Sequence, residues 1–112
     1  MPTPHRPSLA VRRTLRKLGL DLRDARRRRS LPAEVIAGRA FTSRPTLQRI
    51  EAGDHSVSIG IYAAVLQALG LLDGLGQLAD PTQDSVGLAL ASERLPARTR
   101  IPRPRREVDN AK

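Results

Sequence analysis

One short stretch of the 112-residue sequence carries side chains suited to binding nucleic acids. Arg44, Gln48 and Arg49 offer guanidinium and amide groups, which donate paired hydrogen bonds to base edges and to phosphate oxygens. Leu47 and Ile50 lie three residues apart, which places them together on the opposite side of a helix. The stretch therefore predicts a short helix that buries one side and presents hydrogen-bond donors on the other.

Local signals delimit this helix and another one before it. Ser43 is a good N-cap residue, and Gly53 ends the helix as a C-terminal glycine does. Residues 33–40 predict a preceding short helix, started by Pro32, in which the small Ala37 permits another helix to approach closely. Two short helices joined by a tight turn, with donors on the outer side of the second, are typical of a helix-turn-helix that contacts DNA.

The distribution of charge favours a polyanionic partner. The sequence has 20 Lys and Arg against 11 Asp and Glu, with a pI near 11.6. Residues 1–30 carry a net charge of +8, residues 31–93 carry −4 and residues 94–112 carry +5, so the basic groups lie at the two ends. One Phe, one Tyr and no Trp leave no stacking platform for single strands, which favours duplex DNA.

Several functional classes are disfavoured. Without cysteine there is no disulfide framework or thiolate metal site, and a reducing cytoplasm fits. We expect no membrane span, no catalytic residue, no cofactor and no metal, and therefore a cytoplasmic, nucleoid-associated protein that is not an enzyme. His55 is interpreted as a loop residue, and Asp73, Asp80 and Asp84 as capping or turn residues rather than metal ligands.

The apolar pattern predicts an all-α fold of five helices within residues 8–84, after a flexible arm at residues 1–7. Ser8 caps a long first helix, which Gly19 weakens and divides into two in one interpretation. Ser58 and Gly70 delimit the fourth helix, and residues 71–79 form a short fifth. The inward positions of the first and fourth helices are Val11, Leu15, Leu18, Leu22 and Ala25, and Ile59, Tyr62, Ala63, Leu66 and Leu69.

The C-terminal part is less determined by its pattern. Residues 85–94 alternate apolar residues with glycine and alanine, which suits either a strand or a helix. Such a segment after a complete domain suits dimer contact, packing onto its own domain, or a partner protein. Residues 95–112 are rich in proline and arginine without periodicity, and we expect a disordered basic tail.

Residues 22–78 resemble the Xre family of lambda-repressor-like helix-turn-helix domains, most closely at residues 43–53, which read Ser-Arg-Pro-Thr-Leu-Gln-Arg-Ile-Glu-Ala-Gly. Residues 53–81 are more narrowly similar to HipB-like antitoxins, which are encoded beside HipA-type kinase toxins. The resemblance implies a homodimeric repressor of its own operon that binds operator DNA and restrains a HipA-like kinase. The alternatives are a solitary Xre-family regulator and a small basic RNA- or ribosome-associated protein.

The resemblance also implies roles for single residues. Arg44 and Arg49 would read base edges, Ser43 and Thr46 would lie nearer phosphate, and Arg26 and Glu51 would form a buried structural ion pair. The full set of implied DNA contacts is Ser43, Arg44, Pro45, Thr46, Gln48 and Arg49. The sequence departs from the family at Phe41, which replaces the usual turn glycine, and at Pro45, which replaces a polar reader. We interpret Phe41 and Tyr62 as core residues rather than stacking residues.

Overall fold

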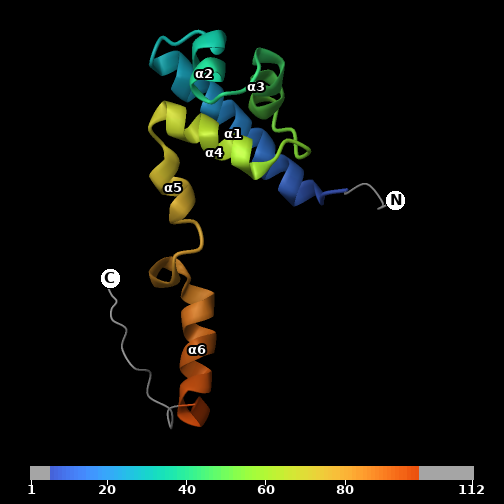
Figure 1. Cartoon of the computed structure of the whole chain (residues 1–112). Coiled ribbons are helices and arrows are strands. Elements are labelled where there is room, and N and C mark those ends of the chain that lie inside the picture. Colours follow the sequence, from blue (N-terminus) through green and yellow to red (C-terminus); the bar gives the residue numbers. More distant parts are fainter. Residues whose placement is uncertain (1–5, 99–112) are drawn as a thin grey trace. The chain divides into compact units, whose positions relative to one another are not determined.

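The computed structural model describes residues 6–98, with side chains described through residue 94. This part of the chain contains helices and no strand, which confirms the all-α class. The elements are α1 (Leu9–Arg28), α2 (Ala33–Arg39), α3 (Arg44–Glu51), α4 (Ile59–Leu69), α5 (Leu72–Gly76), the 3-10 helix η1 (Pro81–Gln83) and α6 (Ser85–Arg98) (Figure 1). The chain divides into two units, one ending at Leu75 and the other beginning at Gly76. Most of the arm and tail expected at residues 1–7 and 95–112 therefore lies outside the described residues.

Serine caps start three of the helices, as the sequence indicates. The Oγ atoms of Ser8, Ser43 and Ser58 accept hydrogen bonds from backbone N–H groups three residues later, at distances of 3.2, 3.2 and 3.3 Å. Gly70 ends α4 in the left-handed region with a φ of 78°. This conformation lets the N–H of Leu71 donate to the carbonyl of Leu66 at 2.8 Å, which closes the last turn.

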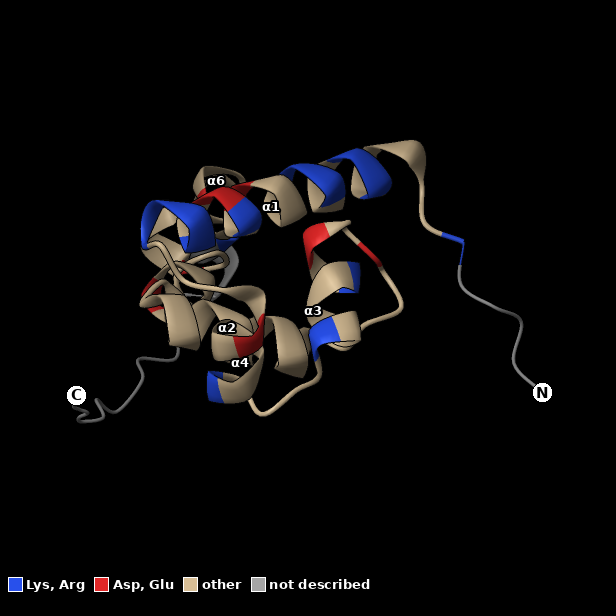
Figure 2. Ribbon diagram, turned by 90° about the horizontal axis from the view of Figure 1, so that it is seen from above, with Lys and Arg blue, Asp and Glu red and all other residues tan. Residues whose placement is uncertain are grey.

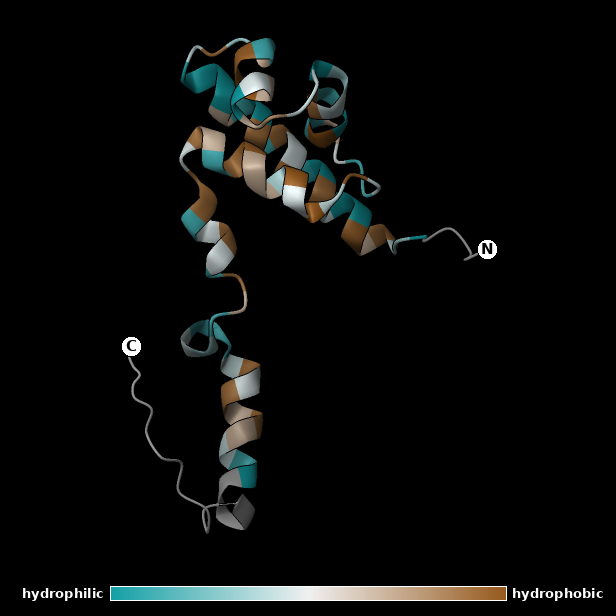
Figure 3. Ribbon diagram, in the orientation of Figure 1, coloured by the Kyte–Doolittle hydropathy of each residue, from teal (hydrophilic) through white to brown (hydrophobic). Residues whose placement is uncertain are grey.

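The hydrophobic core of the first unit lies between α1, α2, α3 and α4. Its most completely buried side chains are Ile36, Leu47, Ile50 and Val65, and apolar colouring runs along α4 and the adjoining parts of its neighbours (Figure 3). Tyr62 is 7% exposed, so its interpretation as a core residue is confirmed.

The expected inward pattern is wrong at two positions and misses a third. Val11 is 46% exposed and Ile59 is 72% exposed, whereas Val65 is fully buried. Because α4 is apolar nearly all around, periodicity alone does not identify which side it buries. Val11 lies in the first turn of α1, whereas the core residues Leu22 and Ala25 lie near the other end of that helix.

Gly19 does not divide α1, which continues unbroken from Leu9 to Arg28. It marks the place where α3 approaches α1 most closely: a Cβ atom there would lie 2.6 Å from the carbonyl oxygen of Glu51 and 2.7 Å from that of Ile50. Gly53, just after α3, likewise lies against the backbone of α1, because a Cβ atom on it would be 2.7 Å from the Cα of Arg16. The two glycines fix the distance between α1 and the end of α3.

The turn between α2 and α3 contains Phe41 in the left-handed region, with a φ of 56°. This conformation lets Thr42 donate its N–H to the carbonyl of Ala37 at 2.9 Å, as a glycine at the same place would. The interpretation of Phe41 as a core residue is wrong, because its side chain is 96% exposed. A residue that ends a helix in this conformation directs its Cβ away from the helix it has just left.

Replacing Phe41 with glycine should raise the free energy of unfolding by about 1 kcal/mol, because glycine adopts positive φ without the steric cost of a Cβ atom. Little packing is lost, since the ring is exposed. Ala52→Gly is a matched control, because Ala52 is also exposed but has a φ of −89°, where glycine costs stability. Urea unfolding measures both variants. Equal destabilisation of the two would show that Phe41 is unstrained.

The second unit begins at Gly76, within the range expected for the helix-turn-helix domain. Residues 76–84, expected in the helix-turn-helix domain, group with α6 instead. The Oδ1 of Asp84 accepts a hydrogen bond from Gly87 N at 2.9 Å, and Asp80 caps η1 by accepting from Thr82 N at 2.8 Å, so side chains in this segment start the helices that follow. The capping roles expected for Asp80 and Asp84 are thereby confirmed.

Residues 85–94 form a helix rather than a strand. Alanine, leucine, glutamate and arginine all favour helix, and together they outweigh the period-two alternation of the apolar residues. The helix continues to Arg98, so residues 95–98, expected in the tail, are helical.

Candidate nucleic-acid interface

The outer side of α3 presents the polar residues that the sequence indicates. Arg44, Pro45 and Gln48 are exposed, while Leu47 and Ile50 are completely buried beneath them. Arg44 and Gln48 are four residues apart and therefore lie on the same side of α3, one turn from each other. Their guanidinium and amide groups share a surface where two neighbouring base pairs or a base and a phosphate are within reach.

Ser43 and Thr46 hold the start of α3 in place. Ser43 Oγ accepts from Thr46 N at 3.2 Å, and the two hydroxyl oxygens lie 3.0 Å apart in a hydrogen bond. Pro45 follows Arg44 in the first turn of the helix, where its missing N–H costs nothing because no intrahelical acceptor exists for it. These contacts fix the first turn of α3, which carries Arg44.

Arg44 and Gln48 line a groove of about 310 Å³ that continues onto α1 and the beginning of α2. We name this groove the arginine groove, and its lining residues are Arg23, Arg26, Arg27, Ala33, Arg44, Gln48, Glu51 and Ala52. It contains four arginines and one glutamate. The Nε of Arg23 is buried without a hydrogen-bond partner, so a cationic donor is already desolvated beside the groove.

Sequence reasoning missed Arg23 and Arg27 as parts of this surface. Their spacing of four residues was a usable signal, because it places both on one side of α1. The cluster of arginines at residues 26–29 instead suggested only favourable charge at a helix C-terminus. The position of α3 against α1, set by the close approach at Gly19, is what brings Arg44 to the same groove.

Arg26 and Glu51 form a two-pronged ion pair between α1 and α3. Arg26 Nε donates to Glu51 Oε2 at 2.8 Å, and Arg26 Nη2 donates to Glu51 Oε1 at 3.1 Å. Arg26 Nη1 also donates to the carbonyl of Leu31 at 3.1 Å. The two side chains are only 13% and 9% exposed. The hydrogen bond to Glu51 raises the pKa of Arg26, against the opposing effect of burial.

Arg49 is engaged within the protein rather than directed freely outward. Its Nε donates to Asp54 Oδ2 at 2.8 Å, and its Nη2 donates to Ser56 Oγ at 2.7 Å. Hydrogen bonds from Ser56, together with the bond from Arg49, hold the pKa of Asp54 well below its usual range. Tyr62 Oη donates to the carbonyl of Asp54 at 2.7 Å, so the loop that binds Arg49 is tied to the core. Two of the three guanidinium nitrogens of Arg49 are thus occupied by the loop after α3.

Basic side chains recur along α1 and on α3, whereas acidic ones are few on both helices (Figure 2). Glu51 at the end of α3 and Asp54 in the loop after it are each paired with an arginine. Their negative charges are therefore compensated locally, which lowers the repulsion that a phosphate would meet there.

A helix-turn-helix with guanidinium and amide groups on its second helix, beside a groove lined by arginines, defines a DNA-binding domain. A protein-family model described as a helix-turn-helix domain matches residues 17–78, which is more than half of the chain. The chain belongs to this family and is a DNA-binding regulator of the Xre-like type at this general level. Neither the curated proteins nor the solved structures gave a significant match.

The part of the chain that the structure describes, residues 6–98, lacks two other features. No three His, Cys, Asp or Glu side chains within this part of the chain are grouped closely enough to hold a metal ion. Over the same residues, none of the helices combines the length and the apolar character that crossing a membrane requires.

Proposed function

We propose that the protein is a homodimeric repressor that recognises duplex DNA by sequence, with α3 in the major groove and the arginine groove on the adjacent backbone. The observation that carries this proposal is the shared position of Arg44 and Gln48 beside Arg23 and Arg27 on α1. Exposed donors on a helix read bases, and arginines at its flank bind phosphates and fix its orientation.

Within this proposal the residues of α3 contact different parts of the DNA. Arg44 pairs with a guanine edge or a phosphate, and Gln48 pairs with an adenine edge. Pro45 offers an apolar contact for a thymine methyl group, and the hydroxyls of Ser43 and Thr46 lie nearer phosphate. Arg49 contributes to readout only by sharing or exchanging its bonds to Asp54 and Ser56.

The second unit supports a proposal for self-association. Val86, Leu88 and Leu90 on α6 are 68%, 50% and 49% exposed. Val86 and Leu90 are four residues apart and share one side of the helix, while Leu88 lies on another. We propose that this helix forms the dimer contact, because a helix of 14 residues with exposed leucines gains stability chiefly by packing. A two-fold dimer pairs two half-sites about one helical turn apart.

The experiment is selection of DNA from a random duplex library by the full chain. We expect enrichment of a site with two related halves about 10 base pairs apart, bound with an affinity that falls steeply as salt rises. A single-stranded RNA library of the same length is the control. Enrichment from RNA with none from the duplex library would replace this proposal by the RNA-associated alternative.

The finer proposal is that the protein is the HipB-like antitoxin of a HipA-like kinase. It rests on the similarity of residues 53–81 to that branch and on the exposed apolar residues of α6. Co-expression with a kinase encoded next to it tests this proposal by co-purification. If the neighbouring gene encodes no such kinase, or the two proteins separate at micromolar concentrations, the solitary regulator is the better description.

A further inference from the structure

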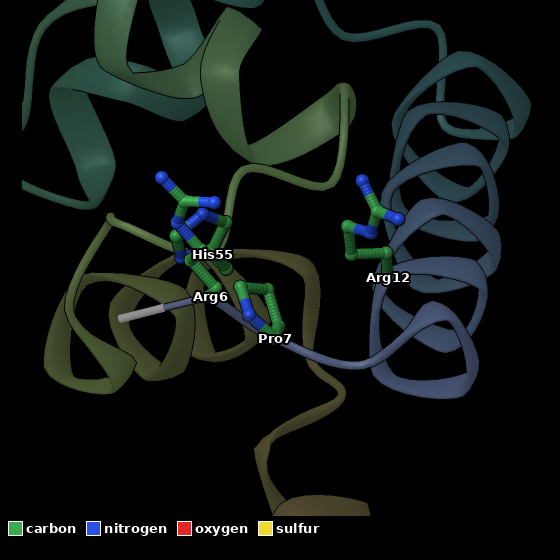
Figure 4. A pocket seen from close by; sticks show the side chains of 4 residues that line it. All are labelled: Arg6, Pro7, Arg12 and His55. Atoms are coloured by element: carbon green, nitrogen blue, oxygen red, sulfur yellow. The ribbon is translucent and has the colours of Figure 1, made fainter. Parts of the chain in front are cut away.

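A second basic concavity lies away from the arginine groove, at the beginning of α1. It has a volume of about 350 Å³ and is lined by Arg6, Pro7, Arg12 and His55 (Figure 4). Arg6 and Pro7 precede α1, Arg12 projects from its first turns, and His55 belongs to the loop between α3 and α4. Two guanidinium groups and one imidazole therefore line one cavity from three separate segments, with Arg12 across the cavity from Arg6, Pro7 and His55 (Figure 4). None of the four lining residues carries a carboxylate.

The chain holds these segments together by backbone contacts. Gly53 lies directly against the backbone of α1 at Leu15 and Arg16, so closely that a Cβ atom would be 2.7 Å from Arg16 Cα. Arg12 is one helical turn before Arg16, and His55 is two residues after Gly53, so the close approach brings these two side chains to the same place. The cavity is thus positioned by the fold rather than by a flexible surface loop.

The other two sides are fixed by hydrogen bonds and by proline. Ser8 accepts from Val11 N at 3.2 Å, which anchors the residue after Pro7 to the start of α1. Pro7 restricts its own φ, which limits the freedom of the backbone just before α1. The carboxylate of Asp54, the neighbour of His55, is bound by Ser56 and Arg49.

The basic side chains that line the cavity favour the binding of an anion. Two arginines that line one cavity repel each other, and an anion between them removes this repulsion while accepting charge-assisted hydrogen bonds. A tetrahedral phosphate offers oxygens in several directions at once, which suits donors that arrive from three sides, whereas a planar carboxylate is satisfied by one guanidinium. Arg6 and Arg12 both lie before residue 17, outside the segment that matches the helix-turn-helix family.

We propose that Arg6, Arg12 and His55 form a phosphate-binding site between the residues before α1, the first turns of α1 and the loop after α3. The phosphate comes either from a DNA backbone or from a small phosphate-bearing molecule, and both present the same group to the cavity. Binding of phosphate alone does not depend on the proposed recognition of DNA, so it remains measurable if that proposal fails.

The test is an NMR titration of the full chain with inorganic phosphate, with sodium acetate as the control anion. We expect saturable shifts of the backbone and side-chain signals of Arg6, Arg12 and His55 at millimolar phosphate. Arg12→Gln should weaken binding about tenfold or more, because a charge-assisted contact is lost. Arg13→Gln is the matched control, since Arg13 is exposed on the same turn of α1 but does not line the cavity, and it should leave affinity within about twofold.

A second arm identifies the source of the phosphate. If a short duplex displaces phosphate from the cavity in wild type, the DNA backbone is the source. If the duplex-bound protein takes up phosphate with unchanged affinity, a separate phosphate-bearing molecule is the source. Shifts that rise linearly without saturation, or equal effects of Arg12→Gln and Arg13→Gln, would overturn the proposal in either case.

Discussion

Replacing Glu51 with alanine should lower the free energy of unfolding by about 3–5 kcal/mol, the usual cost of removing one partner from a buried ion pair. Arg26 and Glu51 are 13% and 9% exposed and share two hydrogen bonds of 2.8 and 3.1 Å. Without Glu51, the guanidinium of Arg26 keeps only its bond to the carbonyl of Leu31 while remaining largely excluded from water. The loss is therefore mainly that of a stranded charge rather than of a contact.

The exposed pair Lys17 and Asp21 provides the matched control. Their side chains are 77% and 57% exposed, so Asp21→Ala should cost less than about 1 kcal/mol. Chemical denaturation of both variants gives the comparison. A double variant, Arg26→Met with Glu51→Leu, removes both charges and should recover most of the stability lost by Glu51→Ala. If Glu51→Ala is no more destabilising than Asp21→Ala, the pair is hydrated in solution and does not hold α1 to α3.

The helices were largely predictable from the sequence because their signals are local. Serine at the start of α1, α3 and α4 and glycine at the end of α4 act on backbone groups within a few residues, so each signal is complete in a short window. The buried positions of α3 were also predictable, since Leu47 and Ile50 are apolar on an otherwise polar helix.

The sequence did not reveal features that depend on packing between helices. Gly19 looked like a weak point in α1, whereas it permits the backbone of α3 to approach. The packing of α3 against α1 is what places Arg23 and Arg27 in one groove with Arg44. The alternation at residues 85–94 suited a strand as well as a helix, because nothing local distinguished the two for a segment that lies outside the first unit.

Arg49 shows most clearly what the sequence left open about the site. Its position on α3 predicts an outward guanidinium, and the resemblance implies a base contact. The partner that occupies it, Asp54, lies beyond the end of the helix, and the loop reaches back only because Gly53 adopts a φ of 79°. A side chain that the sequence correctly predicts to lie on the surface can thus still be hydrogen-bonded to neighbours in the same chain.

Because Asp54 and Ser56 bind Arg49, we expect Arg44 to contribute more than Arg49 to base recognition. Arg44→Ala should weaken binding to a selected operator by about 1–3 kcal/mol, or roughly 5- to 150-fold in Kd, while changing binding to random duplex much less. Arg44 lines the arginine groove beside Gln48 and is exposed, so its guanidinium is accessible to a ligand. Arg49→Ala should cost less on the operator, because its Nε and Nη2 bonds to Asp54 and Ser56 must be given up or shared before it contacts a base.

Asp54→Ala separates the two arginines experimentally. It removes the acceptor of Arg49 Nε, so a guanidinium that is normally held by the loop becomes available, and binding to all duplexes should strengthen with a steeper dependence on salt. The measurement is the affinity of the three variants for operator and random duplex at several salt concentrations. It shows which arginine contributes more to operator binding. An equal loss on both duplexes for Arg44→Ala would assign that residue to phosphate. A larger operator-specific loss for Arg49→Ala than for Arg44→Ala would mean that DNA displaces Asp54, and that the loop after α3 opens when the protein binds its site.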